Sequence, residues 1–118
     1  MRILFLLGTL AALVMTPFGA LAFEKVDTKD EFLSIVGGKT LRLTGIRVQV
    51  TPAGEITGRA FGRGVSGAWQ WRDGYFCRSL YWGSTDLGPN CQEVRAEGSK
   101  IRFTSDRGAG RYADLNIR

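Results

Sequence analysis

Turn-forming sequences recur at short intervals from residue 37 to the C-terminus, and they restrict every segment between them to a short element. The turn sequences are Gly37-Gly38, Pro52-Ala53-Gly54, Asp73-Gly74, Glu97-Gly98 and Asp106-Arg107-Gly108-Ala109-Gly110. Between them apolar and polar residues alternate, which is the period of a strand with one buried face. This pattern predicts a mainly β chain, a small antiparallel meander of seven or eight strands that forms either a barrel or a curled sheet.

The alternation also sets the expected bounds of the strands. They are 41–43, 46–50, 55–63, 65–72, 75–82, 91–95, 100–104 and 111–117. The inward-facing parity changes at Gly45, which predicts a β-bulge or bend there, and residues 84–89 are expected to form a loop. One short helix is expected before the strands, from Lys29 to Val36, because Thr28 and Glu31 form a capping box and Gly37 follows the apolar face.

The N-terminus has the pattern of a secretory signal peptide. A basic residue, Arg2, precedes an apolar run, Pro17 interrupts that run, and Ala20-Leu21-Ala22 supplies small residues before a cleavage site. A membrane anchor would need about 18–20 apolar residues. We therefore expect a cleaved signal peptide over residues 1–22 and a single β domain over residues 23–118. That domain is expected to be periplasmic, with no integral membrane segment after cleavage.

The two cysteines of the chain, Cys77 and Cys91, both lie in the expected mature part. An even count in an oxidising compartment predicts a disulfide. The alternatives are a metal pair or a redox pair. A zinc site normally needs four ligands and the chain contains no His, and the spacing differs from Cys-x-x-Cys. We therefore predict a disulfide that closes a loop of about 15 residues and contributes about 3 kcal/mol of stability.

The basic residues are distributed along the chain without a block of like charge. The formal net charge of +5 includes Arg2, so the expected mature domain carries +4. Scattered Arg residues on strands are more typical of solvated faces than of a nucleic-acid surface. We therefore expect no nucleic-acid partner.

Catalytic motifs are scarce. The absence of His removes the commonest general base. Residues Gly62 to Gly67 match G-x-G-x-x-G, but a dinucleotide site needs a helix to follow, and here an alternating segment and an Asp-Gly turn follow, so a loop is expected. Asp73, Asp86, Asp106 and Asp114 lie mostly at turns, where Asp forms hydrogen bonds with the backbone, and a paired-carboxylate hydrolase stays open as an alternative. Together, these observations favour a non-enzymatic protein without a cofactor or a metal.

The densest feature is the aromatic segment from Trp69 to Trp82. In a small domain one aromatic face is expected to be core. The other interpretation is a ligand groove in which arginines meet an acidic group beside exposed rings. The candidate ligand surface consists of Arg59, Trp69, Trp71, Arg78, Tyr81 and Trp82.

Three motifs together resemble a group of small exported proteins from alphaproteobacteria. They are Trp69-x-Trp71-x-x-Gly74-x-x-Cys77, Tyr81-Trp82-Gly83 with Cys91, and Phe103-Thr104-Ser105-Asp106-Arg107-Gly108. The likeness covers most of residues 23–118 and implies no settled activity. Some members carry the name dihydrodipicolinate reductase, which implies an NAD(P)-dependent oxidoreductase with a Rossmann domain and a histidine-rich motif; this chain has neither feature.

A shorter segment, Gly108-Ala109-Gly110-Arg111-Tyr112, is similar to the Ser-Gly-x-x-Tyr loop of periplasmic lysozyme inhibitors, although its Ser is missing. That likeness implies a disulfide-bearing β-barrel and a lysozyme partner, which is usually basic and would be repelled by a mature charge of +4. The expected function is therefore a periplasmic module that binds a small ligand, an envelope component or another protein. The reductase and the lysozyme inhibitor are the alternatives.

Overall fold

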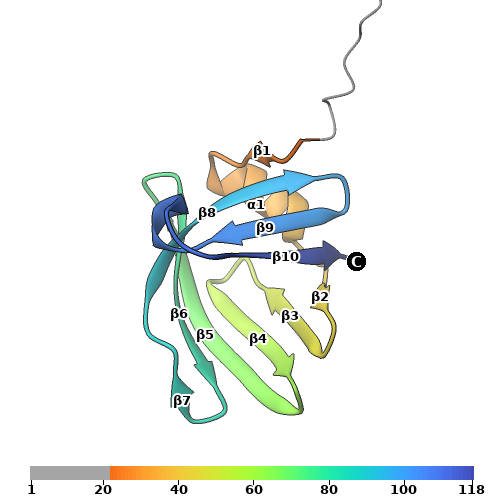
Figure 1. The fold of residues 1–118 in the computed structure, drawn as a ribbon, viewed down its shortest axis with the longest axis vertical. Helices are drawn as coiled ribbons and strands as arrows, with labels where there is room; N and C mark the ends of the chain where they lie inside the picture. Colours follow the sequence, from red (N-terminus) through yellow and green to blue (C-terminus); the bar gives the residue numbers. More distant parts are fainter. Residues whose placement is uncertain (1–21) are drawn as a thin grey trace, which may run out of the picture.

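Eight antiparallel strands form a closed barrel in the computed structural model, which describes residues 22–118 (Figure 1). The barrel strands are β2 (Leu41–Leu43), β3 (Ile46–Val50), β4 (Glu55–Ala60), β5 (Arg63–Arg72), β6 (Tyr75–Trp82), β8 (Asn90–Glu97), β9 (Lys100–Thr104) and β10 (Tyr112–Ile117). The additional elements are β1 (Glu24–Lys25), α1 (Lys29–Val36), β7 (Thr85–Asp86) and the short 3-10 helix η3 (Asp106–Gly108). The predicted signal peptide, residues 1–22, lies outside the described residues except for Ala22.

Closure comes from a pairing between strands that are not adjacent in the sheet order. The order runs β8-β9-β10-β2-β3-β4-β5-β6, and β6 then pairs with β8 through Phe76–Gln92, Cys77–Cys91 and Arg78–Asn90. Beyond this contact the free edge of β6 pairs with β7. The mainly β prediction is confirmed, and the structure decides for a barrel over a curled sheet.

The helix closes one end of the barrel with an aromatic side chain. Phe32 is fully buried, and its ring centroid lies 5.2 Å from those of Trp71 and Phe76 and 5.4 Å from that of Trp69. The predicted cap is present, because the Glu31 amide donates to Thr28 Oγ1 at 3.1 Å. The predicted bounds of the helix, Lys29 to Val36, are confirmed.

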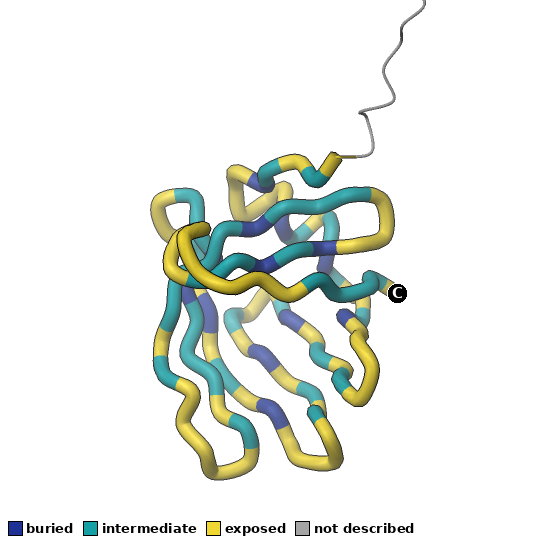
Figure 2. The backbone as a smooth tube through the Cα atoms, viewed as in Figure 1, coloured by how far each residue is buried: buried dark blue, intermediate teal, exposed yellow. Residues whose placement is uncertain are grey.

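Buried and exposed positions alternate along the strands, as the period-two pattern predicts (Figure 2). Directly paired residues of neighbouring strands share a face, so register assigns each side chain to the interior or the outside. Nine buried side chains of the strands share one face by this rule: Leu41, Val50, Ile56, Val65, Trp69, Phe76, Val94, Ile101 and Phe103. The half-cystine Cys77 is also buried but has the opposite parity. The other face is the outer surface of the barrel.

Several local predictions are corrected by the structure. Gly45 lies in a two-residue hairpin turn with Thr44, at φ +79°, and not in a bulge. The strand predicted over 55–63 ends at Ala60, because Phe61 and Gly62 form a turn, and β5 begins at Arg63 inside the predicted loop of 62–67. The predicted change of facing side at Gly45 is present, because Leu43 and Ile46 pair across the turn; a two-residue hairpin turn changes the facing side just as a bulge does.

Two short strands and one turn position were also missed. β1 was not predicted, and β7 lies inside the predicted loop of 84–89. The turn expected at Glu97-Gly98 lies at Gly98-Ser99. A strand of two residues is too short to show an alternation of apolar and polar residues in the sequence. No helix among residues 22–118 is long and apolar enough to cross a membrane.

Candidate functional site

The six residues of the predicted ligand surface are divided between the two faces of the sheet. Trp69, Trp71, Arg78 and Trp82 have the parity of the core face, since Trp71 pairs with Phe76 and Trp82 with Val65. Tyr81 and Arg59 have the opposite parity and lie on the outer face. The structure therefore does not bring the six side chains together on one surface.

Trp69 and Trp71 belong to the aromatic cluster around Phe32. Trp69 is 4% exposed, and its indole N–H donates to the Thr51 carbonyl at 2.9 Å. The Trp71 N–H donates to the Asp27 carbonyl at 3.2 Å. Both indoles thus have their polar atoms satisfied within the fold, which is the arrangement of core tryptophans.

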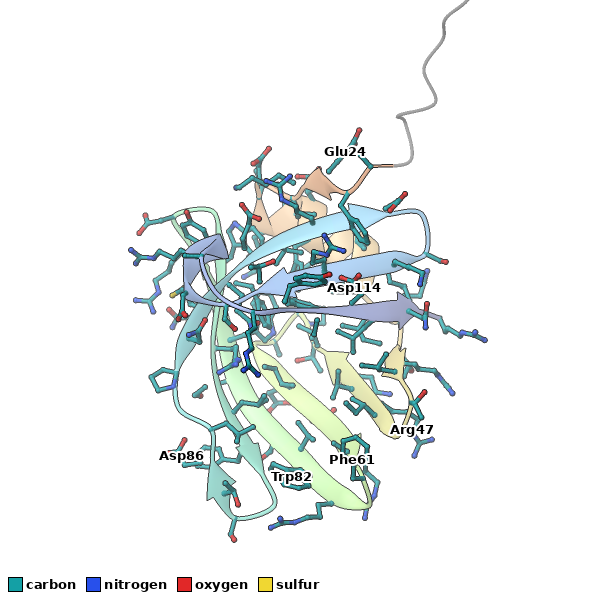
Figure 3. The ribbon with its side chains drawn as sticks, viewed as in Figure 1. Glu24, Arg47, Phe61, Trp82, Asp86 and Asp114 are labelled. Carbon is teal, nitrogen blue, oxygen red and sulfur yellow. A yellow bond between two sulfur atoms is a disulfide. The ribbon has the colours of Figure 1, made fainter. Side chains whose placement is uncertain are left out.

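Trp82 lies at the opposite end of β5 and β6 from Trp71. Its N–H donates to the Ala60 carbonyl at 2.8 Å, and the guanidinium of Arg63 lies 4.5 Å from its ring centroid. Figure 3 shows Trp82 near Phe61 at the lower end of the barrel. Tyr81 is exposed on the outer face of the same strand.

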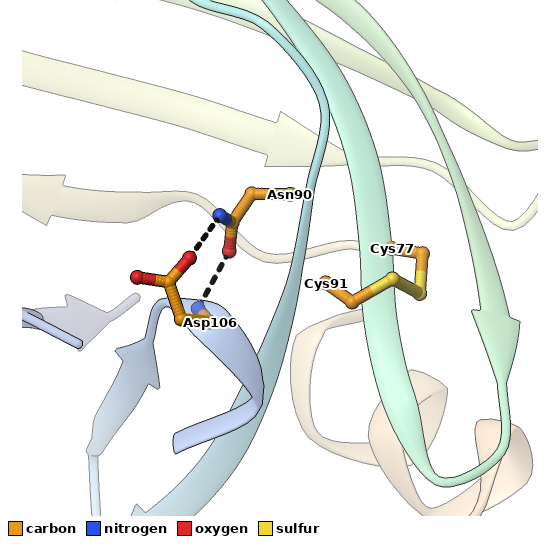
Figure 4. Close-up of a disulfide and its surroundings, with 4 residues drawn as sticks. All are labelled: Cys77, Asn90, Cys91 and Asp106. Atoms are coloured by element: carbon orange, nitrogen blue, oxygen red, sulfur yellow. Dashed lines mark hydrogen bonds between the residues drawn. A yellow bond between two sulfur atoms is a disulfide. The ribbon is translucent and has the colours of Figure 1, made fainter. Parts of the chain in front are cut away.

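A groove of about 1270 Å³ runs along β5 and β6 beside the disulfide. The Cys77–Cys91 bond forms part of its lining and confirms the predicted disulfide (Figure 4). Gln70 and Ser79 contribute from the outer face, and atoms of Trp69, Trp71 and Arg78 also reach the lining. Three of the six predicted residues thus meet at one concave surface.

The groove is strongly cationic. Its lining includes Lys29, Arg72, Arg78 and Arg107, and its lining carboxylate is Asp106. Within residues 22–118 the ion pairs are Lys25–Asp27, Arg95–Glu93 and Arg102–Asp114, and none includes a cation of the groove. The four cations of the groove thus form no ion pair with the described residues, and Asp106 is the one carboxylate in the lining.

Arg78 is the most constrained of these cations. It is half-buried, burial lowers its pKa from the ordinary value, and its Nη1 donates to the Gly88 carbonyl at 2.8 Å. A carbonyl compensates less of the desolvation cost of a buried cation than a carboxylate or phosphate does. An anion beside Arg78 would lower that cost.

The turn that contains η3 contributes Asp106 and Arg107 to the lining of the groove. The Asn90 side chain holds this turn with two hydrogen bonds: its Nδ2 donates to Asp106 Oδ1 at 2.8 Å, and its Oδ1 accepts from the Asp106 amide at 2.9 Å (Figure 4). Asp106 and Arg107 both have positive φ, 56° and 55°, a conformation that is costly for residues other than glycine. This backbone places Arg107 in the groove lining, with its guanidinium 5.6 Å from the Tyr75 ring centroid.

Sequence reasoning missed three of the four groove cations. Lys29, Arg72 and Arg107 lie at a helix start, a strand end and a turn, and no spacing in the sequence connects them. Of these three cations, Arg107 alone lies in a segment that stands out in the sequence, the Gly-rich turn of residues 106–110. Arg78 was found because its strand parity placed it among aromatic side chains.

The other motifs have structural roles. Gly62 lies in the β4–β5 turn and Gly64 and Gly67 lie in β5, so the G-x-G-x-x-G segment opens no helix. A Cβ at Gly67 would lie 2.2 Å from the Ser79 carbonyl oxygen, which explains the glycine by close approach of β6. Within residues 22–118, no three His, Cys, Asp or Glu side chains gather as a metal site requires.

Comparison of the chain with protein-family models, with curated proteins and with solved structures gives no match. The function must therefore be argued from the groove and the surfaces themselves.

Proposed function

We propose that the protein is an exported periplasmic binding domain, without catalytic activity, that holds a small anionic ligand in the groove of β5 and β6. The observation that carries this proposal is the excess of four cations over one carboxylate around a single hollow. Arginine binds phosphate and carboxylate groups through parallel hydrogen bonds, and such charge-assisted bonds are stronger than neutral ones.

Two structural links hold the groove together and support binding. The disulfide joins β6 directly to β8, and Asn90 holds the Asp106–Arg107 turn. A site whose side chains are ordered before binding loses less conformational entropy when the ligand arrives. The half-buried Arg78 supplies the position where an acidic group gains most.

The arrangement offers little for acid–base catalysis. Glu93 and Asp114 have pKa values lowered from the ordinary range, each chiefly by a hydrogen bond from its Arg partner. A general acid at neutral pH needs a raised carboxyl pKa, the opposite direction. Among the described residues, the groove itself is lined by one carboxylate, Asp106, whereas a hydrolase of this kind uses two, so we favour binding.

The test is titration of the protein with inorganic phosphate, pyrophosphate and citrate at low ionic strength, followed by tryptophan fluorescence. Trp69 and Trp71 line the groove, so a bound anion should change their emission. We expect saturable binding of at least one anion. Arg72→Gln and Arg107→Gln should each weaken it about tenfold, the value of a charge-assisted hydrogen bond.

Arg111→Gln is the matched control, because Arg111 is exposed and does not line the groove. It removes the same charge and should change affinity less than twofold. The proposal fails if none of the three anions binds at millimolar concentration, or if the groove variants bind like the control variant. Reduced nicotinamide dinucleotide is a fourth probe; its binding, with turnover of a reducible substrate, would favour the reductase alternative.

A further inference from the structure

A second cationic surface lies on the outer face of β2, β3 and β4. Arg42 is directly paired with Arg47, and Arg47 is directly paired with Arg59. Like charges directly opposite each other on neighbouring strands destabilise a sheet. None of the three takes part in the ion pairs found within residues 22–118.

These three arginines also line one hollow of about 420 Å³ on that surface. The hollow lies against the β2–β3 and β4–β5 turns, since Gly45 and Gly62 complete its lining. Arg59 is oriented by a hydrogen bond from its Nη2 to the Gly62 carbonyl at 2.6 Å. A fourth cation, Arg63, lies at the same end of the barrel.

The turns beside the arginine row expose apolar side chains. Phe61 is 67% exposed at the β4–β5 turn, and Leu43, which precedes the β2–β3 turn, is 44% exposed. The two turns touch, because the Phe61 amide donates to the Gly45 carbonyl at 2.8 Å. Figure 3 shows Phe61 and Arg47 at this end of the barrel.

Phe61 has an unfavourable backbone conformation that burial of its ring does little to offset. Its φ of +51° belongs to the left-handed region, where Gly and Asn are much better tolerated than a bulky aromatic. Its ring lies over Gly45 but remains 67% exposed, so little apolar area is removed from water. A strained residue whose ring is mostly in water points to a role outside the folded core.

We propose that this end of the barrel docks on a bilayer that contains anionic phospholipids. The row of Arg42, Arg47 and Arg59 meets the lipid phosphates, and Phe61 and Leu43 enter the boundary between headgroups and acyl chains. Basic residues near an anionic bilayer and aromatic residues at its interface are the two components that peripheral membrane binding combines. The surface is separate from the groove of β5 and β6, so this inference does not depend on the proposed function.

The experiment is co-sedimentation of the protein with large vesicles of phosphatidylcholine alone or of phosphatidylcholine and phosphatidylglycerol in a 3:1 ratio. We expect binding to the anionic vesicles, weaker binding as salt rises, and little binding to the neutral ones. Arg47→Thr should weaken vesicle binding roughly fivefold, the usual contribution of one basic residue near such a surface. Phe61→Asn, which suits the turn, should weaken it about tenfold through lost apolar contact.

Two controls separate docking from general charge and from misfolding. Arg111→Thr removes one exposed arginine outside the row and should change vesicle binding less than twofold. Thermal unfolding should show that Arg47→Thr and Phe61→Asn are folded and at least as stable as the unsubstituted protein, because each removes an unfavourable feature.

Three outcomes would overturn the proposal. One is equal binding to neutral and anionic vesicles, or to neither. Another is equal weakening by Arg47→Thr and Arg111→Thr, which would mean that only net charge matters. The third is unchanged vesicle binding by Phe61→Asn together with full competition by millimolar inorganic phosphate, which would identify a site for a free anion. Loss of anion binding in Arg72→Gln or Arg107→Gln with vesicle binding intact would keep the two sites distinct.

Discussion

Two outer surfaces of the same barrel carry arginines in register, but only one of them compensates the charge. On β8, β9 and β10, Arg95 is directly paired with Arg102, and each has a carboxylate partner: Glu93 at 2.8 Å and Asp114 at 2.7 Å. On β2, β3 and β4 the row of Arg42, Arg47 and Arg59 has none among the described residues. The difference shows that the fold tolerates directly paired arginines. The sequence supplies carboxylate partners for them on one face and not on the other.

The compensated face is further ordered by aromatic rings. The guanidinium of Arg102 lies 4.2 Å from the Phe23 ring centroid and 4.1 Å from that of Tyr112, and it binds Asp114 through two nitrogen atoms. Cation–π contacts and a bidentate ion pair fix the side chain in one geometry. At the end of the other face, by contrast, the Phe61 ring lies over Gly45 and is 67% exposed. The face of β8, β9 and β10 is thus stabilised by ion pairs, whereas the arginines of β2, β3 and β4 remain available to bind an anionic partner.

The largest effect should come from opening the seam where the barrel closes. The double variant Cys77→Ala and Cys91→Ala removes the covalent link between β6 and β8. A loop of this size contributes about 3 kcal/mol, so the unfolding midpoint should fall by about 15 °C. Thermal unfolding followed by circular dichroism measures the change. Reduction of the unsubstituted protein should reproduce it, and an unchanged midpoint would show that strand pairing alone closes the barrel.

Breaking the compensated face should cost less. Asp114→Asn leaves Arg102 opposite Arg95 without a carboxylate, and we expect a loss of up to about 1 kcal/mol at pH 7, the upper range for partly exposed pairs. Asp73→Asn is the matched control: Asp73 has no ion pair among the described residues, and its positive φ suits Asn equally well. Chemical denaturation measures both. Equal losses in the two variants would contradict a special role of the Arg102–Asp114 pair.

The compensated face should also determine the response to acid. The folded pKa values of Asp114 and Glu93 are lowered, chiefly by hydrogen bonds from Arg102 and Arg95. Their contribution is therefore present above the unfolded pKa values of about 4 and is lost as pH falls through the lowered folded values. Denaturation between pH 6 and pH 2 should show the stabilities of the unsubstituted protein and Asp114→Asn converging at the acid end. Parallel curves would contradict this assignment.

The uncompensated face should give the smallest effect, and one of opposite sign. Arg47 stands between two arginines, so Arg47→Thr should stabilise the fold by about 0.5 kcal/mol and raise the midpoint by about 2–4 °C. Arg111→Thr, outside the row, should change stability by less than half as much. A loss of stability in Arg47→Thr would mean that the arginine row stabilises the fold, and would contradict a row kept for binding a partner.

Local structure was largely predictable from local chemistry. The helix from Lys29 to Val36, the Asp73-Gly74 turn and the strand of Tyr75 to Trp82 were all predicted with their observed positions. Among the local predictions that were wrong, the strand extended through Phe61 has a clear physical cause. A bulky aromatic is disfavoured in a left-handed turn, so propensity assigns it to a strand. The turn exists because β4 and β5 pair in a register that demands it.

The sequence by itself determined a mainly β domain, one capped helix, the apolar–polar alternation of its strands and a Cys77–Cys91 disulfide, because these follow from backbone preferences, periodicity and redox chemistry. Only the tertiary structure decided that β6 meets β8, that Arg42, Arg47 and Arg59 form a row, and that Lys29, Arg72, Arg78 and Arg107 surround one groove. Those neighbours are set by strand register and barrel closure between distant segments, and no pattern within a single segment records them.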